Sequence, residues 1–239
     1  MAEITVSERD YNENNLYYVK NAIADVLNGT GSTFYISRAG SRSLLKIVCP
    51  EGYEETLCAE IADKVAEVVA IKYKYDFFKN SVEARGLSEK EKEIFLAGII
   101  AADLDDDKKY AFDKIKEHKD VAIDGVYNFR LSPLKKKWTE IISYIPTGFP
   151  NTGLKEFISF LLENKKKRIY IDDGKVYDSH YRRLNKSELL GGGELSLLKE
   201  VLLSNCGEIE LSGALPENDE KYIKEFYGGR IFFSAGHFG

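Results

Sequence analysis

The side chains best suited to acid–base chemistry in this 239-residue chain are its three histidines, His118, His180 and His237. His180 has the most reactive neighbours, because Asp178, Arg182 and Arg183 lie within three residues of it. A carboxylate can orient an imidazole for general acid–base catalysis, and an arginine can hold an anionic substrate. These residues are the nucleus of an enzyme hypothesis in which distant parts of the chain complete the site. We favour a solvated loop here, and we assign no catalytic residue.

The acidic run from Asp103 to Asp107 is the best candidate for a metal site. It supplies carboxylates at the first three ligand positions of an EF-hand loop. The sixth position of such a loop requires glycine and the twelfth requires glutamate, whereas this chain has Lys108 and Lys114 there. The run instead predicts the first turn of a helix, where carboxylates interact favourably with the helix dipole.

The cysteines and glycines form no cofactor motif. Cys49, Cys58 and Cys206 match no zinc-ligand spacing, so we expect buried, reduced thiols. Gly29-Thr-Gly31 follows a predicted helix, and no strand precedes Gly191–Gly193, whereas a phosphate loop joins a strand to a helix. We therefore assign no cofactor, no cofactor-binding residue and no metal ligand.

Charge is distributed unevenly along the chain, although the formal net charge is only −5. Residues 1–129 carry a net charge of −7, residues 130–186 carry +7, and residues 187–239 carry −5. The candidate residues for binding nucleic acid or a partner in this basic segment are Arg130, Lys135, Lys136, Lys137, Lys165, Lys166, Lys167, Arg168, Arg182 and Arg183. Such a segment could neutralise phosphates, or it could dock onto acidic regions of this chain or of another copy. We favour docking, because Trp138 and Tyr144 have the spacing of helix core residues and not of a base-stacking surface.

Hydrophobic periodicity predicts helices through most of the chain and strands mainly near its two ends. The first part reads as a strand at 4–6, a helix at 11–27 and a hairpin of 33–37 with 44–48. The predicted helices that follow cover residues 54–82, 107–118, 132–144 and 154–162. Between the first two of these, a capping box at Ser88 and Glu91 opens a further helix, and a short strand is predicted at 121–123.

The last part of the chain alternates strands and helices. Asp172-Asp173-Gly174 predicts the turn of a hairpin between 168–171 and 175–177. A helix at 194–203, a strand at 208–211, a helix at 218–226 and a strand at 229–233 follow. Short crossover helices between strands favour parallel pairing.

The fold class is therefore α+β, with an N-terminal mixed region, a helical middle and a small C-terminal α/β part that contains a mixed sheet. We place the boundary at the basic run that begins at Lys165. The predicted domains are residues 1–165, an α+β region with the helical middle, and residues 166–239, a small α/β domain.

The 28 tyrosine and phenylalanine residues could form a recognition surface or a core. Phe157, Phe160 and Phe232 lie in apolar patterns, so we expect them to pack in the core. Any rings left exposed would suit a protein partner.

Several motifs in the C-terminal half resemble the YtxC-like sporulation proteins of endospore-forming bacteria. They are Val126-Tyr-Asn-Phe-Arg-Leu131, Trp138, Glu156-Phe-Ile-Ser-Phe-Leu-Leu162 and Gly229-Arg-Ile-Phe-Phe233. The resemblance implies a role in sporulation and an intracellular location, but it supplies no mechanism. Members of that family often carry cysteines beyond the last strand, whereas this chain ends in Ser234-Ala-Gly-His-Phe-Gly239. No metal or redox role is therefore carried over.

The favoured hypothesis is a non-enzymatic, cytoplasmic protein that acts in sporulation through contact with an unknown protein partner or with itself. The N-terminus has no apolar stretch of signal-peptide length, and no apolar run approaches the roughly 20 residues that span a bilayer, so we expect no membrane association. The alternative is nucleic-acid binding through segment 130–186.

Overall fold

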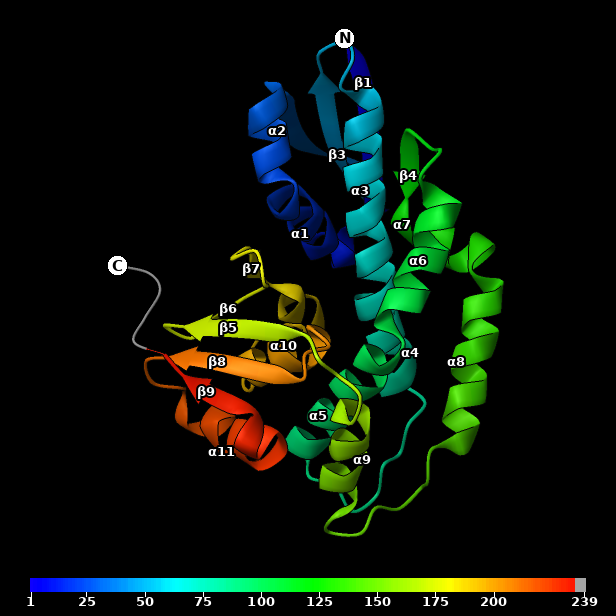
Figure 1. The fold of residues 1–239 in the computed structure, drawn as a ribbon. Coiled ribbons are helices and arrows are strands. Elements are labelled where there is room, and N and C mark those ends of the chain that lie inside the picture. The colour runs from blue at the N-terminus through cyan, green and yellow to red at the C-terminus, as the bar shows by residue number, and fades with distance from the viewer. Residues whose placement is uncertain (235–239) are drawn as a thin grey trace. The chain divides into compact units, whose positions relative to one another are not determined.

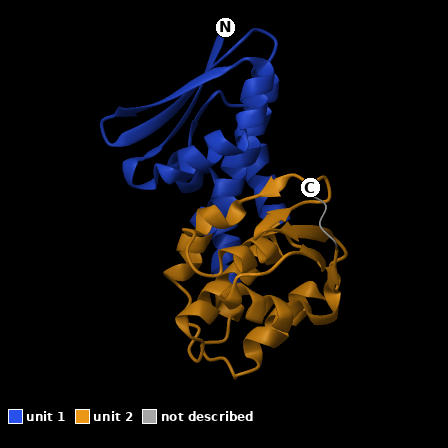
Figure 2. Ribbon diagram, turned by 90° about the vertical axis from the view of Figure 1, so that its left-hand side faces the viewer, with its two compact units in different colours: residues 1–74, 105–141 blue, residues 75–104, 142–239 orange. Residues whose placement is uncertain are grey.

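The computed structural model describes residues 1–234, and it has the α+β architecture expected from the sequence. His237 lies outside the described residues. The chain forms two compact units (Figure 2), each built from two segments. Unit 1 comprises residues 1–74 and 105–141, and unit 2 comprises residues 75–104 and 142–239. Residue 165, the predicted boundary, lies inside unit 2, and independent folding of 166–239 stays a prediction.

Unit 1 contains a four-stranded sheet in the order β2-β3-β1-β4. Its strands are β1 (Ala2–Arg9), β2 (Thr33–Ala39), β3 (Arg42–Cys49) and β4 (Asp120–Ala122). β3 pairs antiparallel with both β1 and β2, and β4 pairs parallel with β1. Alternate residues of β1 and β3 are buried, as expected for a sheet with one face on a core. The hairpin predicted from residues 33–37 and 44–48 is confirmed, because β2 and β3 are consecutive strands that pair antiparallel.

Helices connect and cover these strands. Those of the first segment are α1 (Asn14–Ala22), α2 (Ala24–Thr30) and α3 (Glu54–Val68), and α3 continues through the π-helical turn η2 (Val69–Tyr73) into α4 (Lys74–Lys79). Those of the second segment are α6 (Leu104–Ile115), α7 (Ile123–Gly125), the π-helical turn η3 (Val126–Arg130) and α8 (Ser132–Tyr144). The first segment also contains a 3-10 turn, η1 (Asp10–Asn12), directly after β1. The long helix predicted at 54–82 thus consists of three consecutive parts.

Unit 2 contains a five-stranded mixed sheet in the order β7-β6-β5-β8-β9. Its strands are β5 (Arg168–Asp172), β6 (Lys175–Tyr177), β7 (Arg183–Leu184), β8 (Glu208–Ser212) and β9 (Ile231–Phe233). β5, β8 and β9 are parallel, and β6 and β7 complete the sheet as antiparallel strands. The predicted hairpin and the predicted parallel pairing are both present.

The helices of unit 2 are α5 (Glu89–Ala102), α9 (Gly153–Leu162), α10 (Ser196–Leu203) and α11 (Glu217–Tyr227), with 3-10 turns η4 (Lys186–Leu190) and η5 (Gly228–Arg230). The capping box predicted at the start of α5 is present, with Ser88 and Glu91 bonded to each other. In Figure 1, α10 lies behind β5 and β8. Ile169, Ile171 and Ile209 point to this buried side of the sheet.

Candidate functional site

The basic residues predicted as a binding segment divide between the two units. Unit 1 holds Arg130, Lys135, Lys136 and Lys137, and unit 2 holds Lys165, Lys166, Lys167, Arg168, Arg182 and Arg183. Three of the ten form ion pairs inside their own unit: Lys137 with Asp107, Arg168 with Glu208, and Arg182 with Asp178. Part of the positive charge is therefore balanced within the chain.

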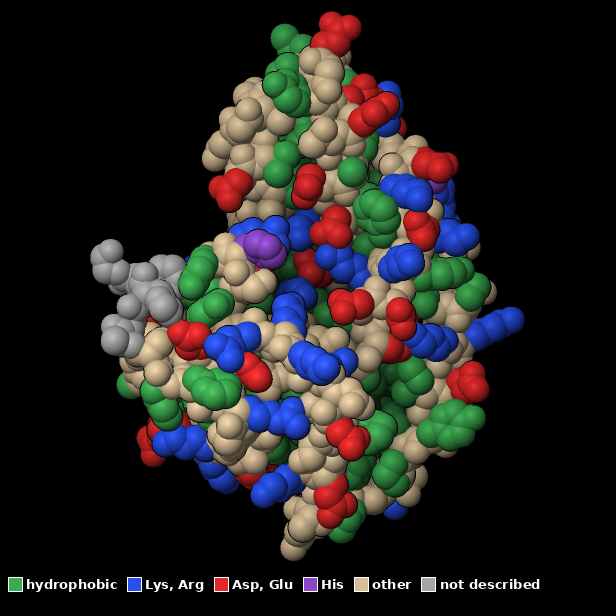
Figure 3. Space-filling model, in the orientation of Figure 1, with side chains coloured by type: hydrophobic (Ala, Val, Ile, Leu, Met, Phe, Trp, Pro, Cys, Tyr) green, Lys and Arg blue, Asp and Glu red, His purple; other side chains and the backbone are tan. Residues whose placement is uncertain are grey.

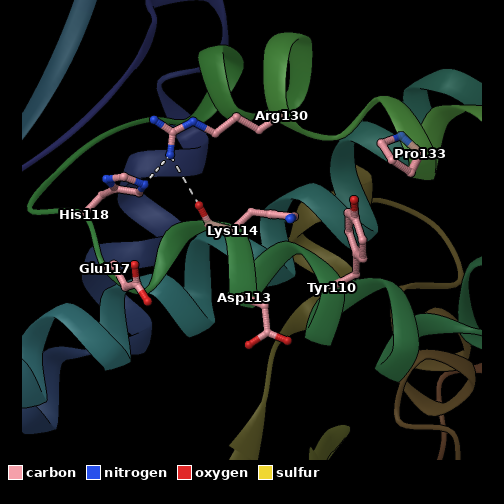
Figure 4. Close-up of a pocket in the computed structure, with 7 residues that line it drawn as sticks. All are labelled: Tyr110, Asp113, Lys114, Glu117, His118, Arg130 and Pro133. Carbon is pink, nitrogen blue, oxygen red and sulfur yellow. Dashed lines mark hydrogen bonds between the residues drawn. The ribbon is translucent and has the colours of Figure 1, made fainter.

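Arg130 lies at a surface pocket of about 460 Å³ at the end of α6 (Figure 4). Its guanidinium contacts the ring of His118 and donates to the carbonyl oxygen of Lys114 at 3.4 Å. Asp113 and Glu117 point away from Arg130 in this view. Because the carboxyl end of a helix carries partial negative charge, an arginine here caps α6. The other cation that lines the pocket, Lys114, lies over the ring of Tyr110, and the lining also includes the carboxylates of Asp113 and Glu117, which does not suit an anionic ligand.

The remaining predicted binding residues of unit 1, Lys135 and Lys136, differ in their surroundings. Lys135 lies over the ring of Tyr127, with its ammonium 4.8 Å from the centroid. The ring of Tyr127 in turn stacks on Trp138. Lys136 is exposed to solvent.

A buried ion pair that the sequence did not reveal lies beside these residues. The carboxylate of Asp107 accepts hydrogen bonds from Lys74 and Lys137, both at 2.7 Å, and from the indole N–H of Trp138 at 2.8 Å. Lys74 and Asp107 are fully buried. Asp105, Asp106 and Asp107 occupy the first turn of α6, as predicted, whereas Asp103 is the C-cap of α5, and Asp107 is also a core residue.

A second polar cluster joins β1, β3 and α7 in unit 1. Buried Glu8 accepts hydrogen bonds from the Tyr73 hydroxyl at 2.8 Å and from the Asn15 amide at 3.1 Å. Burial raises the pKa of Glu8 above its ordinary value. Asp124 pairs with Arg42, whose hydrogen bond lowers the pKa of that carboxyl. These contacts tie the sheet to the second segment of the unit.

The residues around His180 form a turn in unit 2. Asp178 accepts hydrogen bonds from the backbone N–H groups of His180 and Arg182, at 2.8 and 3.0 Å, and from the Arg182 side chain. Burial raises the pKa of Asp178, but these hydrogen bonds outweigh burial and lower it overall. The imidazole of His180 is exposed and contacts the Ser179 hydroxyl at 3.4 Å. The carboxylate therefore holds the turn instead of orienting the imidazole.

Aromatic and charged side chains form a row across the sheet of unit 2, on the face opposite its buried isoleucines. The strand register places one residue of each strand in this row, in the order Arg183, Tyr177, Tyr170, Glu210 and Phe232. Arg168 and Tyr181 adjoin the row. We call these seven residues the aromatic sheet face.

The rings of the aromatic sheet face are held by contacts with their neighbours. Tyr181 stacks on Tyr170 with ring centroids 4.7 Å apart, and the Arg168 guanidinium lies 4.9 Å from the centroid of Phe232. A hydrogen bond with Tyr170 raises the pKa of Tyr181, so this phenol is neutral at physiological pH. Tyr181 and Phe232 are 45% and 43% exposed. The face thus has two exposed rings, each in contact with a neighbouring side chain.

Three of the expected core rings lie elsewhere. Phe160 on α9 is 72% exposed, Tyr144 at the end of α8 is 78% exposed, and Phe232 on β9 is exposed, so the prediction that these rings pack in the core is wrong. Phe157 contacts Phe95 at 4.8 Å between ring centroids, and Trp138 is fully buried. In a strand of only three apolar residues, the sequence pattern does not indicate which side faces the helices. The exposure of Phe232 was therefore not predictable from the sequence.

Within residues 1–234, no three His, Cys, Asp or Glu side chains are arranged to hold a metal ion, and no helix is long and apolar enough to cross a bilayer. Cys49 and Cys206 are buried and Cys58 is half-buried, all three as free thiols. Comparison with protein-family models, with curated proteins and with solved structures gives no match for this chain. The resemblance to the YtxC-like proteins stays a prediction.

Proposed function

We propose that this protein functions by binding another protein through the aromatic sheet face of unit 2. The observation that carries the proposal is that two exposed rings, Tyr181 and Phe232, lie beside the half-buried rings of Tyr170 and Tyr177 and beside Arg168 on one sheet face. Tyrosine and arginine dominate the binding energy of protein interfaces, because each combines a large contact area with hydrogen-bonding groups. A sheet face that is ordered before binding loses little side-chain entropy when a partner docks.

The charges of the face favour a protein over a nucleic acid. Arg168 is paired with Glu208 at 2.7 Å, and Glu210 lies in the row itself between Tyr170 and Phe232. These carboxylates would repel the phosphates that supply most of the affinity of a nucleic-acid complex. Figure 3 shows acidic, basic and hydrophobic side chains intermixed on the side that this sheet presents to the viewer. A protein partner can match such a mixed pattern group by group.

The alternative, nucleic-acid binding by segment 130–186, gains one feature from the structure. The ring of Phe232, which lies next to Arg168 of this segment, is exposed, and unpaired bases stack on exposed rings. Fluorescence anisotropy with single-stranded DNA and RNA separates the two functions. Protein binding predicts no binding at low salt, whereas tight binding that weakens as salt rises would support the alternative.

Affinity capture with the full chain tests the proposal. A partner retained in a fixed molar ratio should be lost when Tyr181 and Phe232 are both replaced by alanine. The matched control replaces Tyr144 at the end of α8 and Phe160 on α9, which are also exposed rings but lie on helices. Equal retention by the wild type and both double variants would contradict the proposal.

The proposal extends to the cellular setting that the family resemblance implies, the cytoplasm of a sporulating bacterium. Its support is the set of motifs that begins at Val126 and closes at Phe233. Immunoblotting of fractionated cells through growth and spore formation checks this setting. Accumulation in the cytoplasmic fraction at the onset of sporulation is expected, and an equal level in cells that form no spores would contradict it.

A further inference from the structure

The outer edge of β2 in unit 1 has unused backbone hydrogen-bonding groups. Among residues 1–234, β3 is the only strand that pairs with β2, which ends the sheet. A two-residue turn at Gly40 and Ser41, with Gly40 at φ +62°, closes the hairpin on the pair Ala39 and Arg42. Such a turn closes on a hydrogen-bonded pair, and hydrogen-bonded pairs then alternate along the ladder. Phe34, Ile36 and Arg38 therefore direct their N–H and C=O groups away from β3.

This edge lacks the features that usually prevent strand addition. Natural sheets protect an edge with a very short strand, a bulge, proline or several charges. β2 runs for seven residues in unbroken register with β3, contains no proline and carries a single charge, on Arg38. The opposite edge strand, β4, has only three residues. β2 also exposes Phe34 and Tyr35, so it can offer both backbone and side-chain contacts.

We infer that β2 pairs with β2 of a second copy of this chain, antiparallel, about a two-fold axis at Ile36. This register joins the outward-facing backbone groups of Phe34, Ile36 and Arg38 to those of the partner copy. Each hydrogen-bonded pair of an antiparallel ladder exchanges two N–H···O bonds. The two sheets become one continuous sheet, and the interface is isologous.

The sequence of β2 is complementary to itself in this register. Phe34 of each copy lies opposite Arg38 of the other, an arrangement that favours a cation–π contact. Arg38 is held near the strand by an ion pair with Glu13 at 2.8 Å, which limits the entropy lost when the ring arrives. A register centred on Arg38 would place two guanidinium groups opposite each other. The pattern of charge therefore selects both the partner and the axis.

Sedimentation velocity of the full chain over a wide range of concentration tests this pairing. The mass of the sedimenting species should rise from 27.1 kDa towards twice that value as concentration increases. Phe34→Arg places like charges opposite each other twice and should weaken the dimer about tenfold. Phe34→Glu places a carboxylate opposite Arg38 of the partner copy, so it should preserve the dimer. Adding Arg38→Glu to Phe34→Arg should restore dimerisation.

Three results would overturn the inference. They are a mass of 27.1 kDa at every concentration, equal weakening by both substitutions of Phe34, and no effect of either substitution. Equal weakening would show a nonspecific hydrophobic contact. Circular dichroism of each variant checks that the chain is folded. If one of the single variants is unstable, the double variant with Phe34→Arg and Arg38→Glu still tests the pairing, because its dimerisation should match that of the wild type. This test does not depend on the aromatic sheet face, so it can fail while the proposed function holds.

Discussion

At the scale of single residues, the carboxylate of Asp107 links three helical segments of unit 1. It accepts hydrogen bonds from Lys74 in α4 and from Lys137 and Trp138 in α8. Removing one partner of a buried ion pair leaves the other charge without compensation inside the protein. Asp107 therefore matters more to the stability of this unit than the other aspartates in the same turn.

Asp107→Asn should lower the free energy of unfolding by about 3 kcal/mol, because it removes a carboxylate that is paired with the buried ammonium of Lys74. Urea unfolding followed by circular dichroism measures the change. Asp105→Asn, an exposed aspartate in the same turn, is the matched control and should change stability by only a few tenths of a kcal/mol. Equal losses in the two variants would show that the helix dipole matters and the buried pair does not.

Glu200 in α10 is a buried carboxyl with one unpartnered oxygen. Oε2 accepts a hydrogen bond from the backbone N–H of Ser187 at 2.6 Å, whereas Oε1 has no hydrogen-bond partner. Burial raises the pKa of Glu200 above its ordinary value. The unfolded chain therefore releases this proton at lower pH than the folded chain does. Stability from this group is full below the unfolded pKa and falls as pH rises through the folded pKa.

Glu200→Gln should accordingly stabilise the protein at about pH 8 and bring no gain near about pH 4, below the pKa of an unperturbed glutamate. Thermal unfolding of the variant and the wild type at both pH values measures the difference. Glu188→Gln, at an exposed glutamate of η4, should have no such pH-dependent effect. A gain of the same size at both pH values would contradict the assigned protonation behaviour.

At the scale of elements, the entry of the chain into β5 and β8 fixes the register of the unit 2 sheet. The backbone N–H of Gly207 donates to the carbonyl oxygen of Lys167 at 2.8 Å just before the two strands pair. A Cβ atom at Gly207 would lie 1.9 Å from the carbonyl oxygen of Lys165. Only glycine allows the two backbones to approach this closely.

Gly207→Ala should destabilise the protein by about 2–3 kcal/mol, because the two backbones must separate to admit the methyl group. The register that aligns Tyr170 with Glu210 should loosen at the same time. Gly148→Ala is the control, since a Cβ atom there has no neighbour within 4 Å. Urea unfolding measures the stability, and amide hydrogen exchange of β5 and β8 measures the pairing. Equal behaviour of the two alanine variants would contradict the close approach.

Elements with a strong local signal were predictable from the sequence. Asp172-Asp173-Gly174 predicted the hairpin of β5 and β6, and the capping box at Ser88 predicted the start of α5. The π-helical turns η2 and η3 and the two-residue strand β7 have no comparable local signal. They form because packing between distant segments overrides local propensity.

The candidate site was harder to predict than the elements that form it. The row from Tyr170 to Phe232 depends on the register between strands that are about 40 and 20 residues apart in the chain. The sequence identified Arg168, Arg182 and Arg183 as binding candidates, but it did not indicate the rings beside them. A shift of one residue in either pairing would turn the rings into the core, so their exposure is a property of the assembled sheet.

At the scale of the whole molecule, we propose two separate surfaces for recognition. They are the sheet face of rings and paired charges in unit 2 and the backbone edge of β2 in unit 1. The charge of segment 130–186 divides between the units. Three of its ten predicted binding residues form ion pairs within their own unit. We therefore propose recognition by shape and local pairing, and not by a long-range electrostatic field.

Site-specific photo-cross-linking in cells tests the central claim most directly. A photoreactive phenylalanine analogue replaces Phe232 on the aromatic sheet face in one strain and Phe160 on α9 in another. We expect a discrete adduct at position 232 that protease removes and nuclease leaves intact, with no such adduct at position 160. An adduct of equal yield at both positions, an adduct that nuclease removes, or no adduct at position 232 would contradict it.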